Sequence, residues 1–588
     1  MSSAFEAYVR PVQAEDSLNR QVYIVGGGLA GLSAAYFFLR DAGVPGKQIH
    51  ILEKEQLPGG ACDGYSFEEA GYIMRGDHKL DDNSPCLADL MHTLPGLSEE
   101  DQTLLEEFVS LNREDPNYSL CRLTEKRGQK VPFDGRFGLS DSACSQIFKL
   151  LLASDEELAE KQIQDLCNED VTDSLFWLYL STSYSFQKNH SAQELKTALQ
   201  HHIGDLAGLP DLSAVSYLKY NIYDALITPL VRELEMAGVN FRYGVHVTDI
   251  AFDCARDHKQ ATRIDYVEKG EEGCIDLGEQ ELLLLTVGSC VENSTRGSQS
   301  ESAFMNTEIR EGGSFELWKR IAEQDPAFGK PEAFSQNPDV SALMSATVTT
   351  LDNKIVSYIK KICKRDPFSG RTVTGGPVTV KDSPWLLSWS VARQPLFVGQ
   401  SKEQCVISLS GLQPLMPGAY VDKPMRDCSG EEICEEWLYH IGVPSDQIEE
   451  LARDHARTIP VMMPFATAAL LPRQPGDRPD VLPEGAKNFA FLGQFAESET
   501  DSASTAEYAV RTGMEAVYKL LHIDRELPDS IGRAYDLRAL LSAASALRDG
   551  RSVRDMSLSR PGKAAVRKAL KLMRGTGLEK RLREEGLL

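Results

Sequence analysis

Six residues near the N-terminus, Gly26-Gly27-Gly28-Leu29-Ala30-Gly31, fit the pattern G-x-G-x-x-G. In this pattern Gly26 permits a tight turn, Gly28 lets a diphosphate approach the backbone, and Gly31 lets a helix pack closely on a strand. Glu53 follows 22 residues after Gly31, the distance at which a carboxylate accepts the ribose hydroxyls of a dinucleotide. The same carboxylate would repel the ribose phosphate of NADP. These residues predict a dinucleotide site.

The elements that must position these residues can be read on either side of them. The residues from Gln21 to Val25 are apolar enough for a short buried strand. A helix follows in the stretch LSAAYFFLRDAG, and Gly43 ends it. A second strand runs from Gln48 to Glu53. Strand, glycine turn, helix and strand make one βαβ unit, and the turn then lies at the amino end of the helix, whose amides bind phosphate.

Three further segments favour FAD over NAD. Leu57-Pro58-Gly59-Gly60 directly follows the ribose acid, LLLLTVGS ends a later strand at Gly288, and FLGQFAE contains Gly493 before another helix. We therefore expect FAD as the cofactor. The expected cofactor-binding residues are Gly26, Gly28, Gly31, Glu53, Gly59, Gly60, Arg75, Gly76, Val247, Gly288, Gly493 and Ser504.

Composition limits the possible partners. The net charge of -25 argues against general nucleic-acid binding, because phosphates would be repelled. No uninterrupted apolar stretch approaches the ~18–20 residues that span a bilayer, and the first residues do not resemble a secretion signal. The twelve cysteines show no Cys-x-x-Cys pair, so we expect no metal site and reduced thiols in a cytoplasmic protein.

The remaining chain predicts an α/β protein. The stretch from Leu97 to Leu206 is mostly helical, and strands are expected at 239–247, 281–287, 378–380, 405–409 and 488–492, with a helix at 505–521. We expect a Rossmann-type FAD-binding domain with an inserted α+β substrate domain and a helical C-terminal region. The expected boundaries are 1–130, 210–310 and 455–525 for the FAD-binding domain, 131–209 and 311–454 for the substrate-binding domain, and 526–588 for the C-terminal region.

The C-terminal region differs in charge from the rest. Residues 551–588 contain eleven Lys or Arg and four Asp or Glu, a net charge of +7. The segment PGKAAVRKALKLMRG has the spacing of an amphipathic helix, which predicts peripheral contact with an anionic bilayer or, alternatively, docking on an acidic protein patch.

Several longer strings extend the argument beyond a generic flavoprotein. They include GGGLAGLSAA, HILEKEQLPGGACDG, DPNYSLCR, HSAQELK, VGSCVENST, KPMRDCSGEEI, VMMPFATA, PRQPGDRP, NFAFLGQFAE and EYAVRTGMEAVY. Through these strings the chain resembles the oleate hydratase family, also called myosin-cross-reactive antigens, from about Val22 to about Leu521. The resemblance implies a homodimer that binds FAD and adds water to a cis double bond of an unsaturated long-chain fatty acid or related lipid, without net redox chemistry at the flavin.

The sequence departs from this family at the positions assigned to catalysis. The family's loop Arg-Gly-Gly-Arg-Glu-Met-Glu corresponds here to residues 75–81, RGDHKLD, so that its first Glu becomes Lys79. A lysine ammonium can donate a proton but cannot accept one from water as a carboxylate does. The candidate catalytic residues of the rebuilt loop are Asp77, His78, Lys79 and Asp81.

The expected substrate site changes as well. The resemblance places the family's catalytic Tyr at Ala198 and a Gln of its site at Ile222. The family's Thr and Asn that hold the fatty acid carboxylate correspond to Ser390 and Ala392. We therefore expect Ala198, Ile222, Ser390 and Ala392 to contact the substrate.

These changes leave three functions open. The first is hydration of an unsaturated fatty acid by the rebuilt loop. The second is a flavin-dependent isomerase or oxidoreductase acting on a polyunsaturated lipid or polyketide-like substrate, which a drier pocket favours. The third is a non-catalytic lipid-binding flavoprotein.

Overall fold

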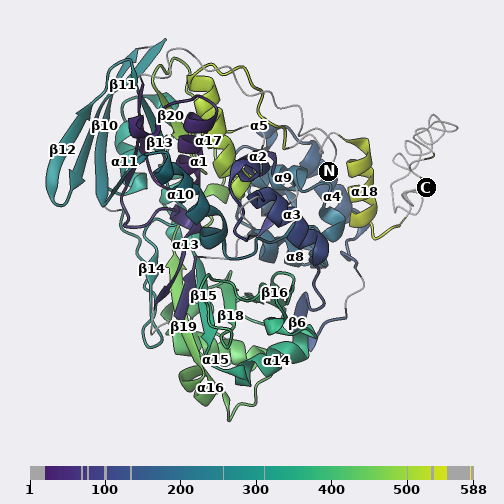
Figure 1. Ribbon diagram of the computed structural model, residues 1–588. Coiled ribbons are helices and arrows are strands. Elements are labelled where there is room, and N and C mark those ends of the chain that lie inside the picture. The colour runs from purple at the N-terminus through teal and green to yellow at the C-terminus, as the bar shows by residue number, and fades with distance from the viewer. Residues whose placement is uncertain are drawn as a thin grey trace.

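The computed structural model describes residues 20–551, together with residues 580 and 583. The gaps in this range are residues 68–70, 76–78, 82, 99–101, 133–134, 256, 310–311, 499–500 and 531–535. Figure 1 shows three bodies: a sheet with helices at the top, a second sheet below it, and a group of helices at the side.

A five-stranded parallel sheet forms the first body. Its order is β20-β13-β1-β2-β9. Chain order therefore reverses at β1, and this topological switch point is where open α/β sheets bind ligands. The strands are β1 (Gln21–Val25), β2 (Ile49–Glu53), β9 (Asn240–Tyr243), β13 (Glu281–Thr286) and β20 (Phe489–Leu492). The predicted strands at 21–25, 48–53, 281–287 and 488–492 are confirmed within a residue, as is the α/β fold class.

Helices surround this sheet, and glycines allow two of their close contacts. The helices are α1 (Leu29–Arg40), α2 (Pro85–Thr93), α3 (Leu104–Glu114), α10 (Thr228–Met236), α11 (Ser314–Ala322) and α17 (Ala506–Leu520). A Cβ on Gly31 would lie 2.1 Å from the carbonyl oxygen of Gly26, so α1 can begin this close to β1 only with glycine. A Cβ on Gly513 would lie 2.8 Å from the carbonyl oxygen of Ala30, so glycine also lets α17 rest on α1.

An antiparallel three-stranded sheet projects from this body (Figure 1). It consists of β10 (Val245–Ala255), β11 (His258–Glu268) and β12 (Glu271–Asp276). The hairpin β3 (Gly64–Phe67) and β4 (Gly71–Met74) leads from the first body to the second sheet. A short pairing of β5 (Leu80–Asp81) with β8 (Val215–Ser216) follows it.

The second body is an eight-stranded sheet of order β14-β19-β15-β18-β17-β16-β6-β7. Its strands are β6 (Leu123–Glu125), β7 (Gln129–Lys130), β14 (Thr295–Arg296), β15 (Leu343–Thr350), β16 (Val378–Val380), β17 (Leu387–Ser390), β18 (Val406–Gly411) and β19 (Ala456–Met463). The outer face is covered by α14 (Asn353–Cys363), α15 (Gly430–His440) and α16 (Ile448–Asp454), seen at the bottom of Figure 1.

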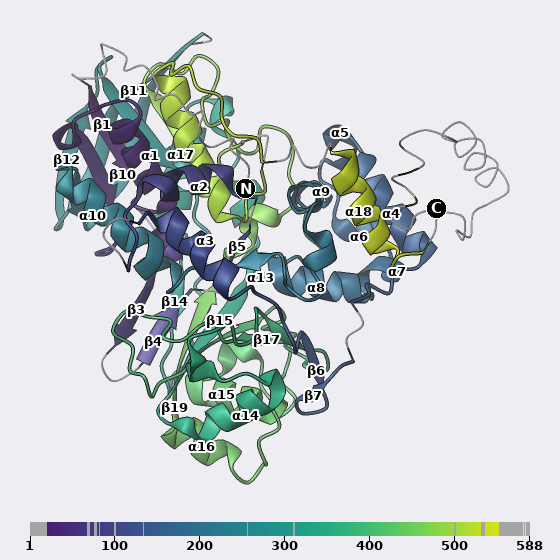
Figure 2. The same ribbon diagram turned by 45° about the vertical axis from the view of Figure 1, so that its right-hand side comes forward.

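The third body is a group of helices with a core of its own. It contains α4 (Asp141–Leu152), α5 (Asp155–Leu158), α6 (Ile163–Leu166), α7 (Glu169–Thr172), α8 (Leu175–Tyr184), α9 (Ala192–His201) and α18 (Leu537–Leu547). Figure 2 shows α18 beside these helices, and its residues Ala543 and Leu547 join their core. The short helices α12 (Glu332–Ser335) and α13 (Pro338–Ser341) precede β15.

The second sheet differs from the domain boundaries expected from the sequence. The strands β6, β7, β14 and β19 fall in ranges assigned to the FAD-binding domain, yet all four belong to the eight-stranded sheet. Residues 131–209 form the helical body rather than joining 311–454 in one domain. Strands of two or three residues, such as β6, β7 and β14, carry no periodicity, so the sequence pattern could not assign them to a sheet. The longer β19 pairs with β15 more than a hundred residues earlier, and local pattern does not show such a pairing.

Two remaining expectations concern the whole chain. All twelve cysteines are free, and most are buried. Among the described residues, no helix is long and apolar enough to cross a bilayer. The basic segment predicted to form an amphipathic helix lies outside the described residues.

Candidate active site

One cavity of about 1220 Å³ connects the three bodies. It begins at the carboxyl ends of β1 and β13, where the parallel sheet has its switch point, and continues along the inner face of the eight-stranded sheet. The ends of α8 and α9 close it on the side of the helical body. The cavity therefore joins the predicted dinucleotide site to a second binding region.

The glycine turn after β1 forms a cradle at one end of this cavity. Gly26 has a φ of +104°, and Gly28 precedes α1 as its N-cap. Gly59, with a φ of +114°, pairs with Gly28 as an isolated bridge. A Cβ on Gly28 would have no protein atom closer than 3.9 Å, so the space above this residue is open. Exposed amides at a helix start beside open space fit a diphosphate group.

Glu53 is fixed beside this cradle. Its Oε2 accepts a hydrogen bond from the amide of Gly27 at 2.6 Å, and its Oε1 accepts one from Glu55 at 2.8 Å. Burial raises the pKa of this carboxyl group, and the two amide hydrogen bonds oppose the rise. Glu53, Lys54 and Val247 line the same end of the cavity. The geometry fits a ribose and its attached base.

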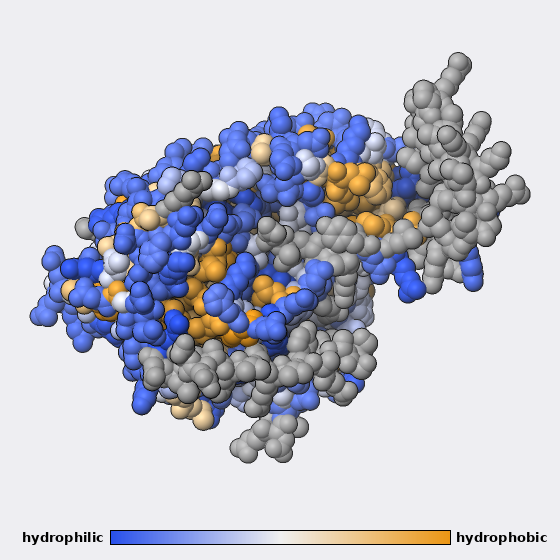
Figure 3. Space-filling model, turned by 90° about the horizontal axis from the view of Figure 1, so that it is seen from above, coloured by the Kyte–Doolittle hydropathy of each residue, from blue (hydrophilic) through white to orange (hydrophobic). Residues whose placement is uncertain are grey.

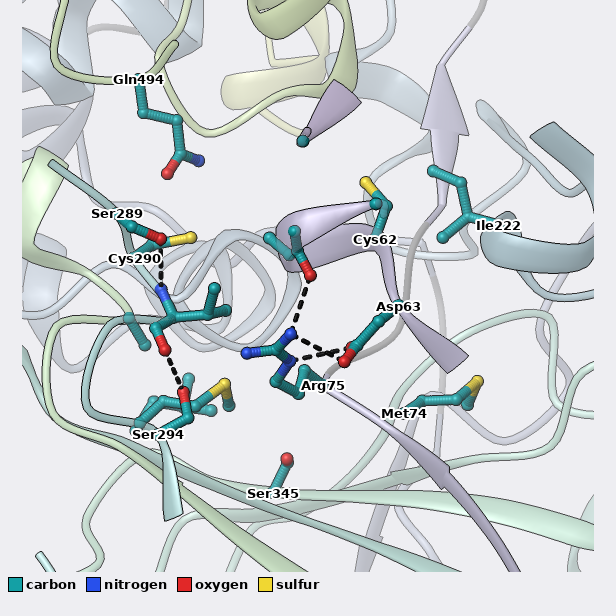
Figure 4. A pocket seen from close by; sticks show the side chains of 18 of the residues that line it. Cys62, Asp63, Met74, Arg75, Ile222, Ser289, Cys290, Ser294, Ser345 and Gln494 are labelled. Carbon is teal, nitrogen blue, oxygen red and sulfur yellow. Dashed lines mark hydrogen bonds and ion pairs between the residues drawn. The ribbon is translucent and has the colours of Figure 1, made fainter. Parts of the chain in front are cut away.

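An ion pair stands where the cradle opens toward the second sheet. Arg75 Nε donates to Asp63 Oδ1 at 2.8 Å, Nη2 lies 2.7 Å from Oδ2, and Nη2 also donates to the carbonyl of Gly60 at 2.9 Å. Figure 4 shows Arg75 between Asp63 and the pair Ser289 and Cys290, with Ser345 below it. Hydrogen bonding and charge attraction from Asp63 raise the pKa of Arg75 against the effect of its burial. A fixed cation–carboxylate pair therefore lines the cavity.

A second polar cluster lies at the end of α8. The Nζ of Lys79 donates to the carbonyl of Ser183 and lies 4.6 Å from the centre of the Tyr184 ring. The Tyr184 ring stacks on His202, with centroids 4.5 Å apart and an interplanar angle of 29°. Lys79, Tyr184 and His202 all line the cavity.

The wall between the two clusters is largely apolar. Its residues come from the β3–β4 hairpin and the inner face of the eight-stranded sheet. They are Tyr65, Phe67, Ile73, Leu343, Val461 and Met463. Such a wall suits an acyl chain, since most of a ligand's surface in a deep site is buried against apolar side chains.

Most of the residues predicted from sequence lie around this cavity. Those that line it are Gly26, Gly28, Glu53, Gly59, Gly60, Arg75, Lys79, Ile222, Val247, Gly288, Ser390, Gly493 and Ser504. Gly31 instead packs beneath the cradle. Gly76, Asp77 and His78 lie outside the described residues. Asp81 is the last residue of β5, and only its backbone is described.

Two expected substrate contacts lie outside the cavity lining. Ala198 sits on the buried face of α9 and packs in the core of the helical body. Ala392 packs against a small cluster around Tyr72 and Phe397 and borders a separate small pocket with Arg393. In both cases a methyl group is too short to reach past neighbouring side chains, whereas the longer family residues would extend further.

Sequence reasoning missed several cavity residues. Tyr184 and His202 occur singly and match no motif. Asp63 lies in the string HILEKEQLPGGACDG, which pointed to the family and not to this residue. A weaker signal existed in the second sheet, where hydroxyl residues recur at a spacing of two and therefore share one face of a strand. They are Ser345 and Thr347 on β15, Ser388 and Ser390 on β17, and Ser408 and Ser410 on β18, and all six line the cavity.

The fold and the glycine cradle define a protein with a Rossmann-type dinucleotide-binding sheet. In overall fold it is similar to the solved structure of putrescine oxidase bound to putrescine, with a TM-score of 0.50 at 11% identity, covering 86% of this chain and 99% of that one. At this identity the similarity concerns the fold alone.

Closer relatives define the family. The MCRA family matches residues 19–518, and the chain belongs to it. An oleate hydratase from Streptococcus pyogenes serotype M49 is 38% identical over 100% of this chain and 99% of its own length. A linoleate hydratase from Lactiplantibacillus plantarum is 27% identical over 84% of this chain and 92% of its own length. The family resemblance predicted from the sequence is thus confirmed.

Proposed function

We propose that this protein is an FAD-dependent fatty acid hydratase, which adds water to a cis double bond of an unsaturated long-chain fatty acid. The observation that carries the proposal is the single cavity that joins a dinucleotide cradle to an apolar wall, in a chain whose full length matches a hydratase. Both relatives named above are hydratases of unsaturated acids, which supports a substrate of this class.

The cradle fits FAD by its chemistry. The amides at the start of α1, directly after Gly28, would bind the diphosphate, Glu53 the ribose, and the region of Gly288 and Gly493 the flavin ring. FAD in this position would supply a flat wall and, when reduced, negative charge beside the double bond. Arg75, which Asp63 fixes at the cavity wall, would offset such charge.

Hydration needs an acid that protonates one alkene carbon and a base that accepts a proton from the attacking water. We assign proton donation to the segment that follows Arg75 in the sequence, which carries Asp77 and His78 and ends at Asp81 on β5. Asp63 is the carboxylate that the ion pair holds at the cavity wall, so we assign it the orientation of the attacking water and the acceptance of its proton. The net change is one hydrogen on one carbon and one hydroxyl on the other.

A double-bond isomerase is the second candidate. Ile222 and Met74 bring apolar side chains to the cavity near Arg75 (Figure 4), where the family resemblance places a glutamine instead of Ile222. A drier site favours a proton shift without water addition.

Product analysis separates these functions. Protein reconstituted with reduced FAD is incubated with oleate or linoleate in heavy-oxygen water, and products are identified by mass spectrometry. Hydration predicts a hydroxy acid with the label in its new hydroxyl group. An unlabelled product of unchanged mass would instead establish isomerisation. Bound but unchanged fatty acid would point to a lipid-binding flavoprotein.

Membrane contact and dimer formation belong to the same proposal. Exposed apolar side chains lie at the end of α4 and on α18, where Leu152 is 85% and Leu540 is 37% exposed. Figure 3 shows one apolar patch on this side and a second apolar area nearer the middle of the same face. With the net positive charge of residues 551–588, this supports contact with an anionic bilayer.

The homodimer and the cytoplasmic location implied by the sequence stay predictions, which sedimentation and cell fractionation would measure.

A further inference from the structure

Arg122 is a buried cation with unusual partners. Its side chain is 2% exposed, and it donates to the carbonyls of Pro377 and Tyr179 and to the hydroxyls of Thr379, Thr182 and Ser183. Across the described ranges, no carboxylate lies within ion-pair distance of it. Burial lowers the pKa of Arg122 to about 10, so the protein does not compensate the full cost of placing this charge inside.

The end of α8 offers only part of a counter-charge. The Ser183 carbonyl in its last turn accepts a hydrogen bond from Lys79, and the Tyr179 carbonyl, further back in the helix, accepts one from Arg122. A helix C-terminus carries roughly half a negative charge. Among the described residues, Arg122 therefore meets carbonyl and hydroxyl dipoles and no carboxylate. A buried positive region of this kind is expected to receive an anion.

Hydrogen bonds connect Arg122 with the cavity. The Ser183 hydroxyl accepts a hydrogen bond from Arg122 Nη2 at 2.9 Å, and Ser183 lines the cavity. A hydroxyl that accepts from a cation still has its own hydrogen to donate, and the cation strengthens that donation. Lys79 lines the cavity at the same place and brings an ammonium group with three N–H donors.

The distance from this anion site to the cofactor end suits a long ligand. Thr379, Ser388, Ser410 and Ser345 stand opposite one another on β16, β17, β18 and β15. Three strand spacings of ~4.8 Å separate the two ends of this row, or ~14 Å. Ser345, at the far end, lies below Arg75 in Figure 4. An extended acid held at Ser183 would thus bring a mid-chain double bond toward Arg75.

We infer that Ser183 and Lys79, with Arg122 behind them, form the anchor for the carboxylate of the fatty acid. The inference rests on the proposed function for the class of ligand, and it places the anchor at the end of α8 rather than at Ala392. The Ser183 hydroxyl and the Lys79 ammonium donate to the two carboxylate oxygens. Arg122 polarises the Ser183 hydroxyl through its hydrogen bond and does not itself contact the carboxylate.

Binding without turnover tests this inference. Palmitate and methyl palmitate have no double bond, so their dissociation constants with the FAD-loaded protein are measured at equilibrium by displacement of a fluorescent fatty acid. We expect the wild type to bind the acid at least about tenfold more tightly than the ester, which is about 1.4 kcal/mol. Ser183→Ala should lower this ratio several-fold, and Arg122→Gln should bring it close to one.

The controls keep the result interpretable. Arg296→Gln removes an exposed cation at the cavity rim and should leave the acid-to-ester ratio unchanged. If Arg122→Gln does not fold, the acid-to-ester ratio of Ser183→Ala alone tests the anchor. An unchanged ratio in Ser183→Ala, or a wild type that binds acid and ester equally, would overturn the anchor, even if oleate is hydrated. A ratio that depends on Ser183 would support it even if oleate is not hydrated.

Discussion

Lys79 and Tyr184 form a cation–π contact, with the Lys79 ammonium 4.6 Å from the centre of the Tyr184 ring. The same ammonium donates to the carbonyl of Ser183 at the end of α8. The resemblance to the oleate hydratase family places a catalytic glutamate at this position. In this chain the position carries a cation, Lys79, that contacts the end of α8. The resemblance therefore predicts that hydration by this chain depends on an acidic group elsewhere in the cavity.

Lys79→Glu tests the role of this cation. If Lys79 attracts the fatty acid carboxylate, a glutamate there repels it, and the KM for oleate should rise at least about tenfold without an increase in kcat. Lys79→Arg keeps the charge and should stay within about threefold of the wild-type KM, which makes it the matched control. Steady-state kinetics measures both. A higher kcat in Lys79→Glu would show that this position takes part in the chemistry and would contradict the anchor role.

A pair of glycine substitutions tests the cofactor cradle. Gly28→Ala places a methyl group in open space, so the protein without FAD should keep its thermal stability. FAD binding should weaken at least about tenfold, because the methyl group would occupy the position of the diphosphate. Gly31→Ala meets the Gly26 carbonyl at 2.1 Å and should instead destabilise the fold itself. Calorimetry and flavin titration measure these effects. Equal FAD affinity for Gly28→Ala and wild type would show that the diphosphate does not bind next to Gly28.

Asp63→Asn tests the carboxylate assigned to the orientation of water. The amide keeps the size of the side chain but cannot accept a proton, so kcat for hydration should fall by about 10²–10⁴-fold. The FAD content and the KM should change much less, and absorbance of the purified variant provides the control for cofactor loading. Full activity in a variant that binds FAD normally would exclude Asp63 as the base.

Glu507 predicts a pH dependence of stability. Burial, followed by the charge of Asp501, raises its pKa from 4.5 to about 7, and its nearest ionisable neighbours are Asp501, Arg511 and Cys86. A carboxyl group with a raised folded-state pKa contributes stability below its unfolded pKa, and this contribution is lost as pH rises from about 4.5 to about 7.

The neutral substitution Glu507→Gln isolates this contribution. The difference in melting temperature between wild type and Glu507→Gln should change in favour of the variant between about pH 4.5 and about pH 8, since only the wild type loses a proton there. Calorimetry across this range measures the difference. A constant difference would show that Glu507 does not titrate in this interval.

The sequence predicted the parallel sheet because its strands are continuous apolar runs and its turns carry glycine. Gly28 and Glu53 occupy the expected places, since their roles depend on local spacing within one βαβ unit. The eight-stranded sheet was harder to predict, because β6 and β14 are short and pair with strands far away in the chain. Local patterns carry no information about such pairings.

The polar end of the cavity depends on contacts between distant segments. Arg122 belongs to the string DPNYSLCR, which the sequence offered only as a mark of resemblance, and its partners lie on α8 and β16. Tyr184 and His202 meet because α8 and α9 end at the same place. No spacing rule connects residues on separate elements, so only the fold brings them together.

The flavin absorption spectrum during titration with oleate tests the central claim most directly, since that claim is one cavity shared by FAD and an acyl chain. The protein is loaded with FAD, and visible spectra are recorded as oleate is added under anaerobic conditions. We predict a saturable shift of the flavin bands with one acyl chain bound per flavin. Oleate that binds with full affinity while the flavin spectrum stays unchanged, or protein that takes up no FAD, would contradict it.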